Sequence, residues 1–429
     1  MINKQHRILF IICFLGSSIA AYAQGSLGNS PLTRQPFGEY VMEGFSRNRA
    51  MGGAAIGNPS GEYINIENPA LLWYNRTSNI EAVLQGQIRN ISDRTNSQRT
   101  GGVVPVNFGL AFPVSKRTSM AFGIKPLSFT DYNISYNEPV AGINDTVNYQ
   151  LKGAGGLAKA FVGAGVRLNN YFSVGLEGGL TFGNLTYDRN IRFFGSAEPI
   201  ANVQTSNRYV GFNAKPGISF RTATDSSKTH FFTVGLVYDY GFDMNLSRKN
   251  TYQIMADEGL PYFTDTLNSL NGYKVGSPGT IALGMAYSKE QHYTFAFDAA
   301  FTNWSNYKDP SGNASSIPNT TRLALGYEWI PDLYSGKYLK LIAYRLGVSY
   351  KTLPLEFNNK QVNDLKVTAG FGFPVIRKEA RYMRPYINLS MFAGQRANLA
   401  SNNLSEFYFG ASIGITLNDT QWFRRFRIE

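Results

Sequence analysis

From about residue 76 to the end of the chain, apolar and polar residues alternate with a period of two. One segment alternates small or polar residues with Phe232, Val234, Leu236, Tyr238, Tyr240, Phe242 and Met244. Segments around 174–183, 293–301 and 407–417 show the same pattern. Because successive side chains of a strand point to opposite faces of a sheet, the pattern predicts an all-β protein.

The length of these segments separates two kinds of β-structure. A secreted β-sandwich also alternates, but its strands usually have about 5–6 residues. A tilted strand needs about 9–11 residues to cross a bilayer, and several segments here reach ten or more. Aromatic residues lie at the ends of the apolar face: Tyr238, Tyr240, Tyr293, Tyr327, Trp329, Tyr344 and Tyr350. These features favour a transmembrane barrel, which must close because no strand edge can stay open in lipid.

The alternating segments predict a 14-stranded antiparallel barrel over residues 76–429. The predicted strands centre near Ala82, Gly109, Lys125, Val162, Leu180, Gly217, Leu236, Leu283, Phe297, Leu325, Leu346, Phe371, Leu389 and Ile413. Short connections (114–118, 169–171, 289–292 and 377–381) alternate with long polar ones (89–101, 191–207, 245–274, 303–320 and 351–364). Outer-membrane barrels have short periplasmic turns and long outer loops, so we expect both termini in the periplasm.

Residues 1–23 have the organisation of a secretory signal peptide. Lys4 and Arg7 precede a short apolar core at 8–20, and 21–23 fits the A-x-A cleavage pattern. The alternative, an uncleaved anchor helix, needs about 20 apolar residues. Cleavage would remove Cys13, the one cysteine of the chain, so we expect no disulfide or thiolate metal site. The predicted location is the bacterial outer membrane, which the chain crosses many times.

Residues 24–75 lie between the signal peptide and the first strand and have no period-two order. A fourteen-stranded wall encloses space that water or protein must fill. The segment carries much apolar surface, so we expect a plug inside the lumen. A periplasmic loop or a partner-docking arm is the alternative.

Two short motifs in this segment resemble a known family. Gly52, Gly53 and Ala54 lie in a small-residue stretch at 50–56, and Asn68, Pro69 and Ala70 follow. This order resembles the N-terminal hatch of FadL-type outer-membrane transporters, and the accessory barrels of type IX secretion share it. The resemblance implies uptake of long-chain fatty acids or other hydrophobic compounds, with release by hatch movement or through a lateral opening at a kinked strand.

Pro126 and Pro216 lie inside predicted strands. Proline removes a donor from the hydrogen-bond ladder, so each marks a bulge, a kink or simply a strand end.

The charge of the chain is positive but dispersed. There are 41 Lys and Arg against 29 Asp and Glu, a formal net charge of +12, and no basic patch that would indicate nucleic-acid binding. The excess of basic over acidic residues is consistent with contact with outer-membrane lipid and lipopolysaccharide. Charges expected in the lumen are Lys125, Arg167, Glu177, Asp239, Asp243, Asp298, Glu328 and Arg345. Because both basic and acidic side chains are expected there, ion pairs across the lumen are the favoured interpretation. Lys125 and Arg167 are the candidate contacts for an anionic ligand such as a fatty acid.

Enzyme motifs receive little support from the sequence. Residues 410–414 match G-x-S-x-G, but they continue an alternating strand rather than forming a strand-to-helix turn. His230 and His292 are expected near periplasmic turns, away from Ser412. The glycines of 153–156 lack the lysine of a phosphate-binding loop. We expect no catalysis, no cofactor and no metal site.

The C-terminal residues 418–429 combine aromatic residues with three arginines. They suit the periplasmic headgroup zone or a periplasmic partner equally well.

We expect a channel for uptake of hydrophobic small molecules such as long-chain fatty acids or hydrocarbons. The alternative is a non-transporting barrel subunit of an outer-membrane secretion or assembly complex. An apolar path past the hatch would favour transport, whereas a lumen closed by ion pairs and an exposed apolar patch on loops would favour the subunit. A membrane lipase would need a base beside Ser412.

Overall fold

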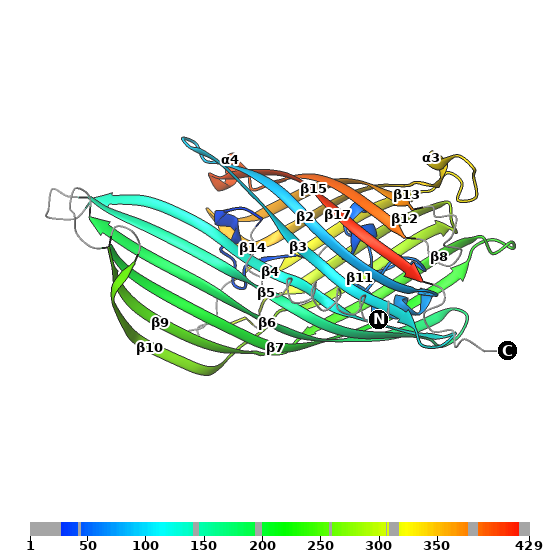
Figure 1. The fold of residues 1–429 in the computed structure, drawn as a ribbon, viewed down its shortest axis with the longest axis horizontal. Helices are drawn as coiled ribbons and strands as arrows, with labels where there is room; N and C mark the ends of the chain where they lie inside the picture. Colours follow the sequence, from blue (N-terminus) through cyan, green and yellow to red (C-terminus); the bar gives the residue numbers. More distant parts are fainter. Residues whose placement is uncertain are drawn as a thin grey trace, which may run out of the picture.

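In the computed structural model, most of the chain forms one barrel, and its first described residues, 27–41 and 44–75, lie inside (Figure 1). The described residues are 27–41, 44–139, 146–193, 200–256, 260–305, 307–308, 317–375 and 385–419. The predicted signal peptide, the short connection at 377–381 and the tail after Asp419 lie outside them.

The wall consists of antiparallel strands that close when β17 pairs with β2. Their bounds are β2 (Ser78–Ser92), β3 (Ser97–Pro113), β4 (Thr118–Pro139), β5 (Thr146–Arg167), β6 (Phe172–Phe193), β7 (Ile200–Ala223), β8 (His230–Gly241), β9 (Met244–Met255), β10 (Pro261–Val275), β11 (Gly279–Lys289), β12 (Tyr293–Asn303), β13 (Thr320–Trp329), β14 (Ala343–Phe357), β15 (Lys360–Pro374), β16 (Tyr386–Arg396) and β17 (Ser405–Asp419).

Two of the wall strands are interrupted. β7 pairs with β9 along its first half and with β8 along its second half, so β8 and β9 are two parts of one strand. β10 and β11 are likewise two parts of the next strand, interrupted at 276–278. The wall therefore has fourteen strands, and each predicted strand centre lies in a different one. The predicted fold class is confirmed.

The alternation reflects the two sides of the wall. Apolar side chains such as Phe295, Phe409 and Ile413 face outward and are about half exposed, whereas Glu177 and Thr233 face inward and are buried. No helix among the described residues is long and apolar enough to cross a membrane.

The two ends of the barrel differ, and we call them the turn end and the loop end. The turn end has short connections such as 114–117 and 168–171, and β17 ends there at Asp419, beside Ser78 (Figure 1). It also carries the helix α3 (Tyr338–Leu341), whereas α4 (Leu399–Asn402) lies at the loop end.

Four of the five predicted long polar loops (89–101, 191–207, 245–274 and 351–364) are wrong, because most of their residues continue the strands. The fifth, 303–320, is different, because its described residues from 304 to 319 lie between β12 and β13. β4 to β7 have 22 to 24 residues each, more than twice the length needed to cross a bilayer. Above the membrane both faces of a strand contact water, so the apolar alternation stops while the pairing continues. In Figure 1 these strands, with β9 and β10, form a sheet that projects beyond the other strands; we call it the loop-end sheet.

Residues 27–75, called the N-terminal segment below, are mostly buried inside the barrel. They form η1 (Pro31–Thr33), β1 (Glu39–Tyr40), α2 (Ser46–Ala50) and η2 (Pro69–Tyr74). Asn68 caps η2, since its Oδ1 accepts the Ala70 N–H at 3.0 Å and Pro69 occupies the first helical position.

Candidate functional site: the lumen and its N-terminal segment

Glycines of the wall bring the N-terminal segment into direct contact with the strands. A Cβ at Gly347 would overlap the backbone of Met51 and Gly52, and one at Gly235 would overlap Ile56. The same holds for Gly109, Gly165, Gly175, Gly217, Gly284, Gly326, Gly370 and Gly414, each against an atom of residues 45–69. Only glycine permits this approach, which explains why small residues alternate along the lumenal face.

Strands without such a glycine contact the segment through polar groups. Glu81 in β2 accepts the Ser46 N–H at 2.8 Å, and Ser119 in β4 donates to the Asn75 carbonyl at 3.0 Å. Asp298 in β12 accepts the N–H groups of Ala55 and Ile56 at 2.6 and 2.9 Å. Since α2 packs against β16, residues 45–75 contact all fourteen wall strands. A small cavity of about 50 Å³ remains between these residues and the wall, beside Ile56 and Asp298.

The predicted small-residue motif lies at the centre of this contact. Gly52 and Gly53 have φ of +66° and +84°, a conformation that favours glycine. The Gly52 N–H donates to Thr368 Oγ1 at 3.0 Å, and Arg322 donates to the Gly53 carbonyl at 2.7 Å. Ala54 packs in an apolar cluster with alanines of β11, β12 and β13.

The second motif joins the first one to the wall. Asn68 Nδ2 donates to the Ile56 carbonyl at 2.9 Å and to the Ile218 carbonyl of β7 at 3.3 Å. Pro69 lies against Gly165 and Gly175, and the Ala70 carbonyl accepts a hydrogen bond from Ser173 at 2.8 Å. The motif residues therefore act together in docking the segment.

A first group of buried charges, the lysine cluster, links β4 to β8 with the N-terminal segment. It consists of Lys125, Lys159, Lys215, Glu67, Glu177 and Asp239. Glu67 accepts from Lys125 at 2.8 Å, and Lys215 lies 3.7 Å away. Burial would raise the pKa of Glu67, but these lysines hold its pKa well below the usual range.

A second group, the arginine cluster, lies on the opposite strands. It consists of Arg89, Lys351, Arg396, Glu39, Asp364 and Glu406. Glu39 of β1 contacts Arg396 at 2.5 Å and Arg89 at 3.0 Å. Burial acts to raise the pKa of Glu39, but the two guanidinium groups outweigh it and hold the pKa at about 2.

A third group, the Glu328 cluster, lies nearer the turn end and consists of Arg47, Glu328 and Arg345. Arg47 of α2 and Arg345 of β14 each donate to Glu328 at 2.7 Å. Arg345 also donates to Asn388 at 2.9 Å and lies over the Tyr63 ring. All three clusters thus join the N-terminal segment to the wall.

The two candidate ligand contacts lie apart. Lys125 is half-buried in the lysine cluster, where Glu67 is its partner. Arg167 lies at the turn end, where it donates to the Asn169 carbonyl and to Asn170, and its guanidinium lies over the Trp73 ring. The sequence pattern missed Lys159, Lys215, Arg89 and Arg396, although their charge on an inward-facing position of a strand was a usable signal.

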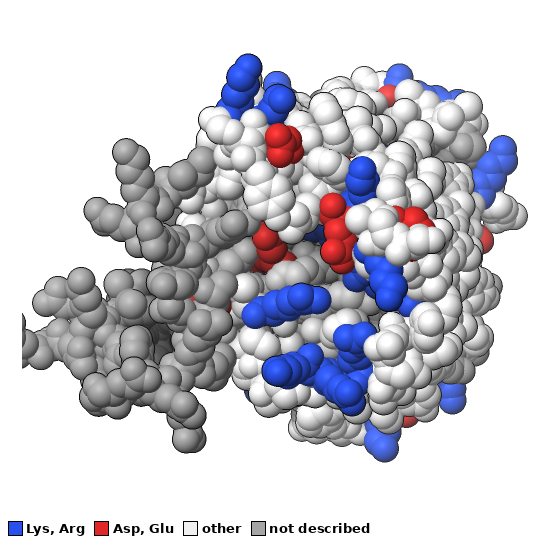
Figure 2. All heavy atoms as spheres, turned by 90° about the vertical axis from the view of Figure 1, so that its right-hand side faces the viewer, with Lys and Arg blue, Asp and Glu red and all other residues white. Residues whose placement is uncertain are grey.

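Two cavities lie on either side of residues 45–75. The outer cavity, about 140 Å³, is lined by apolar residues such as Tyr40, Leu127 and Trp304 and by the charged residues Lys159, Asp239, Arg322 and Lys351. The inner cavity, about 390 Å³, opens at the turn end, and its lining includes Glu328 and Arg345. Figure 2 shows the hollowed face of the turn end, with basic and acidic side chains around the hollow.

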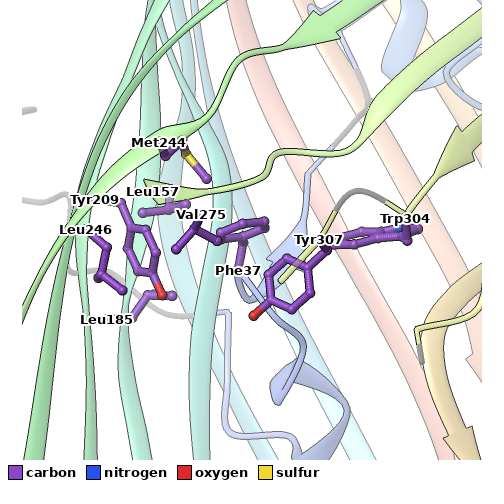
Figure 3. Packing of buried hydrophobic residues seen from close by; sticks show 9 residues of the cluster. All are labelled: Phe37, Leu157, Leu185, Tyr209, Met244, Leu246, Val275, Trp304 and Tyr307. Carbon is purple, nitrogen blue, oxygen red and sulfur yellow. The ribbon is translucent and has the colours of Figure 1, made fainter. Parts of the chain in front are cut away.

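An apolar cluster fills the lumen toward the loop end (Figure 3). Phe37 of the N-terminal segment lies at its centre, with Tyr209, Trp304 and Tyr307 around it at ring distances of 5.3 to 6.3 Å. Leu157, Leu185, Met244, Leu246 and Val275 complete the cluster. Side chains of this protein therefore occupy part of the lumen on its loop-end side, beside the outer cavity that Trp304 also lines.

The wall separates between β3 and β4. These strands pair only over 108–113 and 119–124, and β4 then continues to Pro139 without β3, paired with β5 on its other side. Pro126 lies at the register shift just beyond this point, so it marks a bulge. The N-terminal segment covers the free edge of β4: the Val41 N–H donates to the Leu127 carbonyl at 2.9 Å and the Ser30 N–H to the Asp131 carbonyl at 2.8 Å. Pro216 lies in β7 without a register shift.

The G-x-S-x-G residues lie inside β17, where Ser412 shares a hydrogen bond of 2.6 Å with Ser390. His230 bonds Asp225 near the turn end, and His292 contacts the Ile330 carbonyl.

The family model described as BamG matches residues 1–429. The chain belongs to the BamG family.

A search of curated proteins finds no match. Solved structures with the same fold include the Pseudomonas putida toluene transporter TodX (TM-score 0.59, 15% identity, 89% of this chain and 99% of that one). The CymD monoaromatic hydrocarbon channel has a TM-score of 0.58 at 14% identity, covering 88% of this chain and 98% of that one. A Pseudomonas aeruginosa FadL homologue has a TM-score of 0.56 at 12% identity, covering 92% of this chain and 100% of that one. The predicted FadL-type barrel is confirmed, and these likenesses concern the fold.

Proposed function

We propose that this BamG-family protein is a non-transporting β-barrel subunit of a protein complex in the bacterial outer membrane, where it acts through its surfaces. The observation that carries the proposal is the contact of residues 45–75 with all fourteen wall strands. The outward apolar belt and the barrel fold support the location.

The charges of the lumen support a permanently closed barrel. Glu39, Glu67 and Arg47 of the N-terminal segment are each paired with wall residues in buried surroundings. Removing one partner of a buried ion pair costs about 3–5 kcal/mol. Displacing the segment would separate all three groups of pairs, so thermal motion would seldom open the lumen.

The position of Phe37 also argues against an apolar cargo. Phe37 occupies the centre of the apolar cluster on the loop-end side of the lumen, where it takes up apolar space. The outer cavity beside it is lined by both apolar and charged residues, so its lining favours neither function.

Uptake of hydrophobic small molecules is the second candidate function. It is favoured by the fold shared with hydrocarbon channels and by the β3–β4 separation, where only the N-terminal segment covers the edge of β4. Under this proposal, Phe37 and residues 28–41 would move aside, and Lys125 would exchange Glu67 for the carboxylate of a fatty acid.

Native mass spectrometry of the protein, extracted from its own membrane in mild detergent, separates the two proposals. The subunit proposal predicts the barrel in stoichiometric complex with other proteins and without a bound fatty acid. A lone barrel with a fatty acid or hydrocarbon bound, lost on Asn68→Ala, would contradict it and support uptake.

A further inference from the structure

The loop-end sheet has two edges, and the chain covers only one of them within its described residues. The edge of β4 is covered by residues 28–41. The edge of β10 is different. β10 pairs with β9 on one side, and no described residue pairs with its other side over 261–275.

β10 is exposed on both faces as well as along this edge. Residues 260–272 are exposed without interruption. The large apolar side chains among them are Leu260 (68% exposed), Tyr262 (63%), Phe263 (48%), Leu267 (57%) and Leu270 (40%). β11 and β12 have 11 residues each, enough to cross the membrane, and β10 lies beyond them toward the loop end. These apolar groups are therefore outside the lipid belt.

Exposed edge strands are ordinarily protected against pairing with strands of other chains. Soluble edges are blunted by lysine, proline or a bulge, because free N–H and C=O groups pair readily with another strand. β10 has three register shifts against β9, between Pro261 and Phe263, between Thr266 and Asn268, and between Leu270 and Tyr273, so its regular stretches are short. Charge and proline add little protection, because Asp265 is the only charged residue between 262 and 273 and proline occurs only at Pro261.

We propose that the free edge of β10 is a docking site for an extended strand of a different protein, which adds to the loop-end sheet next to β10. This inference rests on the proposed function as a complex subunit and names the surface that performs it. Main-chain hydrogen bonds would supply affinity, and the exposed apolar side chains would select a strand with apolar residues at alternate positions.

The charged residues of the β9–β10 hairpin indicate which charges a partner strand would have. Near the base of the β9–β10 hairpin lie Arg248, Lys249 and Lys274. Toward its tip lies Asp265. A complementary strand carries acidic residues beside the base of the hairpin and basic residues beside its tip.

A second copy of this chain does not fit this edge. Two barrels in one membrane are related by an axis along the membrane normal. Wall strands tilt by about 35–45°, so that axis would cross the two β10 strands at roughly 70–90° instead of aligning them. The partner is therefore a different protein.

Two substitutions on β10 test the docking site in the intact complex. Leu267→Lys with Leu270→Lys places charge along the free edge. The matched control, Asn245→Lys with Ser247→Lys, places the same charges on exposed positions of β9, which is paired on both sides. We expect at least a tenfold loss of co-purifying partner for the β10 variant and none for the control, with heat-modifiable gel migration showing that both barrels fold.

Cross-linking identifies what occupies the edge. Leu267→Cys is labelled with benzophenone maleimide in intact cells, with Ser247→Cys as the control. We expect a cross-link at position 267 to a strand of another protein with alternating apolar residues and none at 247. A cross-link to a second copy, or to lipopolysaccharide alone, would overturn the proposal. So would a partner that the β10 variant retains in full, although the subunit function would then stand. Absence of any stoichiometric partner from the wild type would overturn both.

Discussion

At the scale of single residues, Glu328 is the group whose charge the lumen depends on most clearly. Glu328→Gln would leave Arg47 and Arg345 buried without a counter-ion. We expect the free energy of unfolding to fall by about 3–5 kcal/mol in detergent micelles, measured by guanidinium unfolding. The control is Glu290→Gln, because Glu290 is 59% exposed in its pair with Arg221 and should change stability by less than about 1 kcal/mol. Equal effects of the two variants would contradict this role.

Gly347 tests the fit between wall and N-terminal segment. Gly347→Val places a branched side chain where the backbone of Met51 and Gly52 lies. We expect residues 45–56 to be displaced and to become accessible to added protease in the folded barrel. Gly178→Ala is the control, since a Cβ there meets no atom within 4 Å. A protected segment in the valine variant would show that the glycine contact is dispensable.

The sequence was least informative about contacts between individual residues. Inward-facing charges could be predicted from the period-two pattern, and ion pairing was the favoured interpretation. Which charges meet could not be predicted, because Glu39 and Arg396 are far apart in the chain and β1 has no recognisable period.

At the scale of elements, β1 is held to the wall through Glu39, and acid should weaken this attachment. The pKa of Glu39 lies at about 2, below its ordinary 4.5. A lowered pKa contributes stability that is present above pH 4.5 and is lost as the pH falls toward 2. We expect the unfolding free energy of the wild type to exceed that of Glu39→Gln by a constant amount from pH 7 to 5. The difference should then shrink below pH 4.5, and a difference that grows with acidity would contradict the assignment.

The number and position of the wall strands could be predicted because lipid imposes apolar alternation on one face for about ten residues. The same rule failed above the membrane, where β9 and β10 were expected to be loops. Their residues alternate no more clearly than a loop does, and only the pairing of β9 with β7 and of β10 with β9 defines them as strands.

At the scale of the whole molecule, the fold agrees with hydrocarbon channels while the lumen is occupied by this chain's own residues. The hatch motifs indicated a plug, but sequence alone could not decide whether the plug opens. That question depends on the three ion-pair clusters and on the glycines that bring wall and segment together.

The most direct test of a closed, non-transporting barrel is uptake into proteoliposomes. Wild-type protein is reconstituted, and entry of a fluorescent long-chain fatty acid and of toluene is compared with protein-free vesicles and with Gly347→Val. We predict that the wild type passes neither compound above the protein-free rate, while displacement of the N-terminal segment in the variant raises entry. Saturable uptake of either compound by the wild type would contradict the central claim.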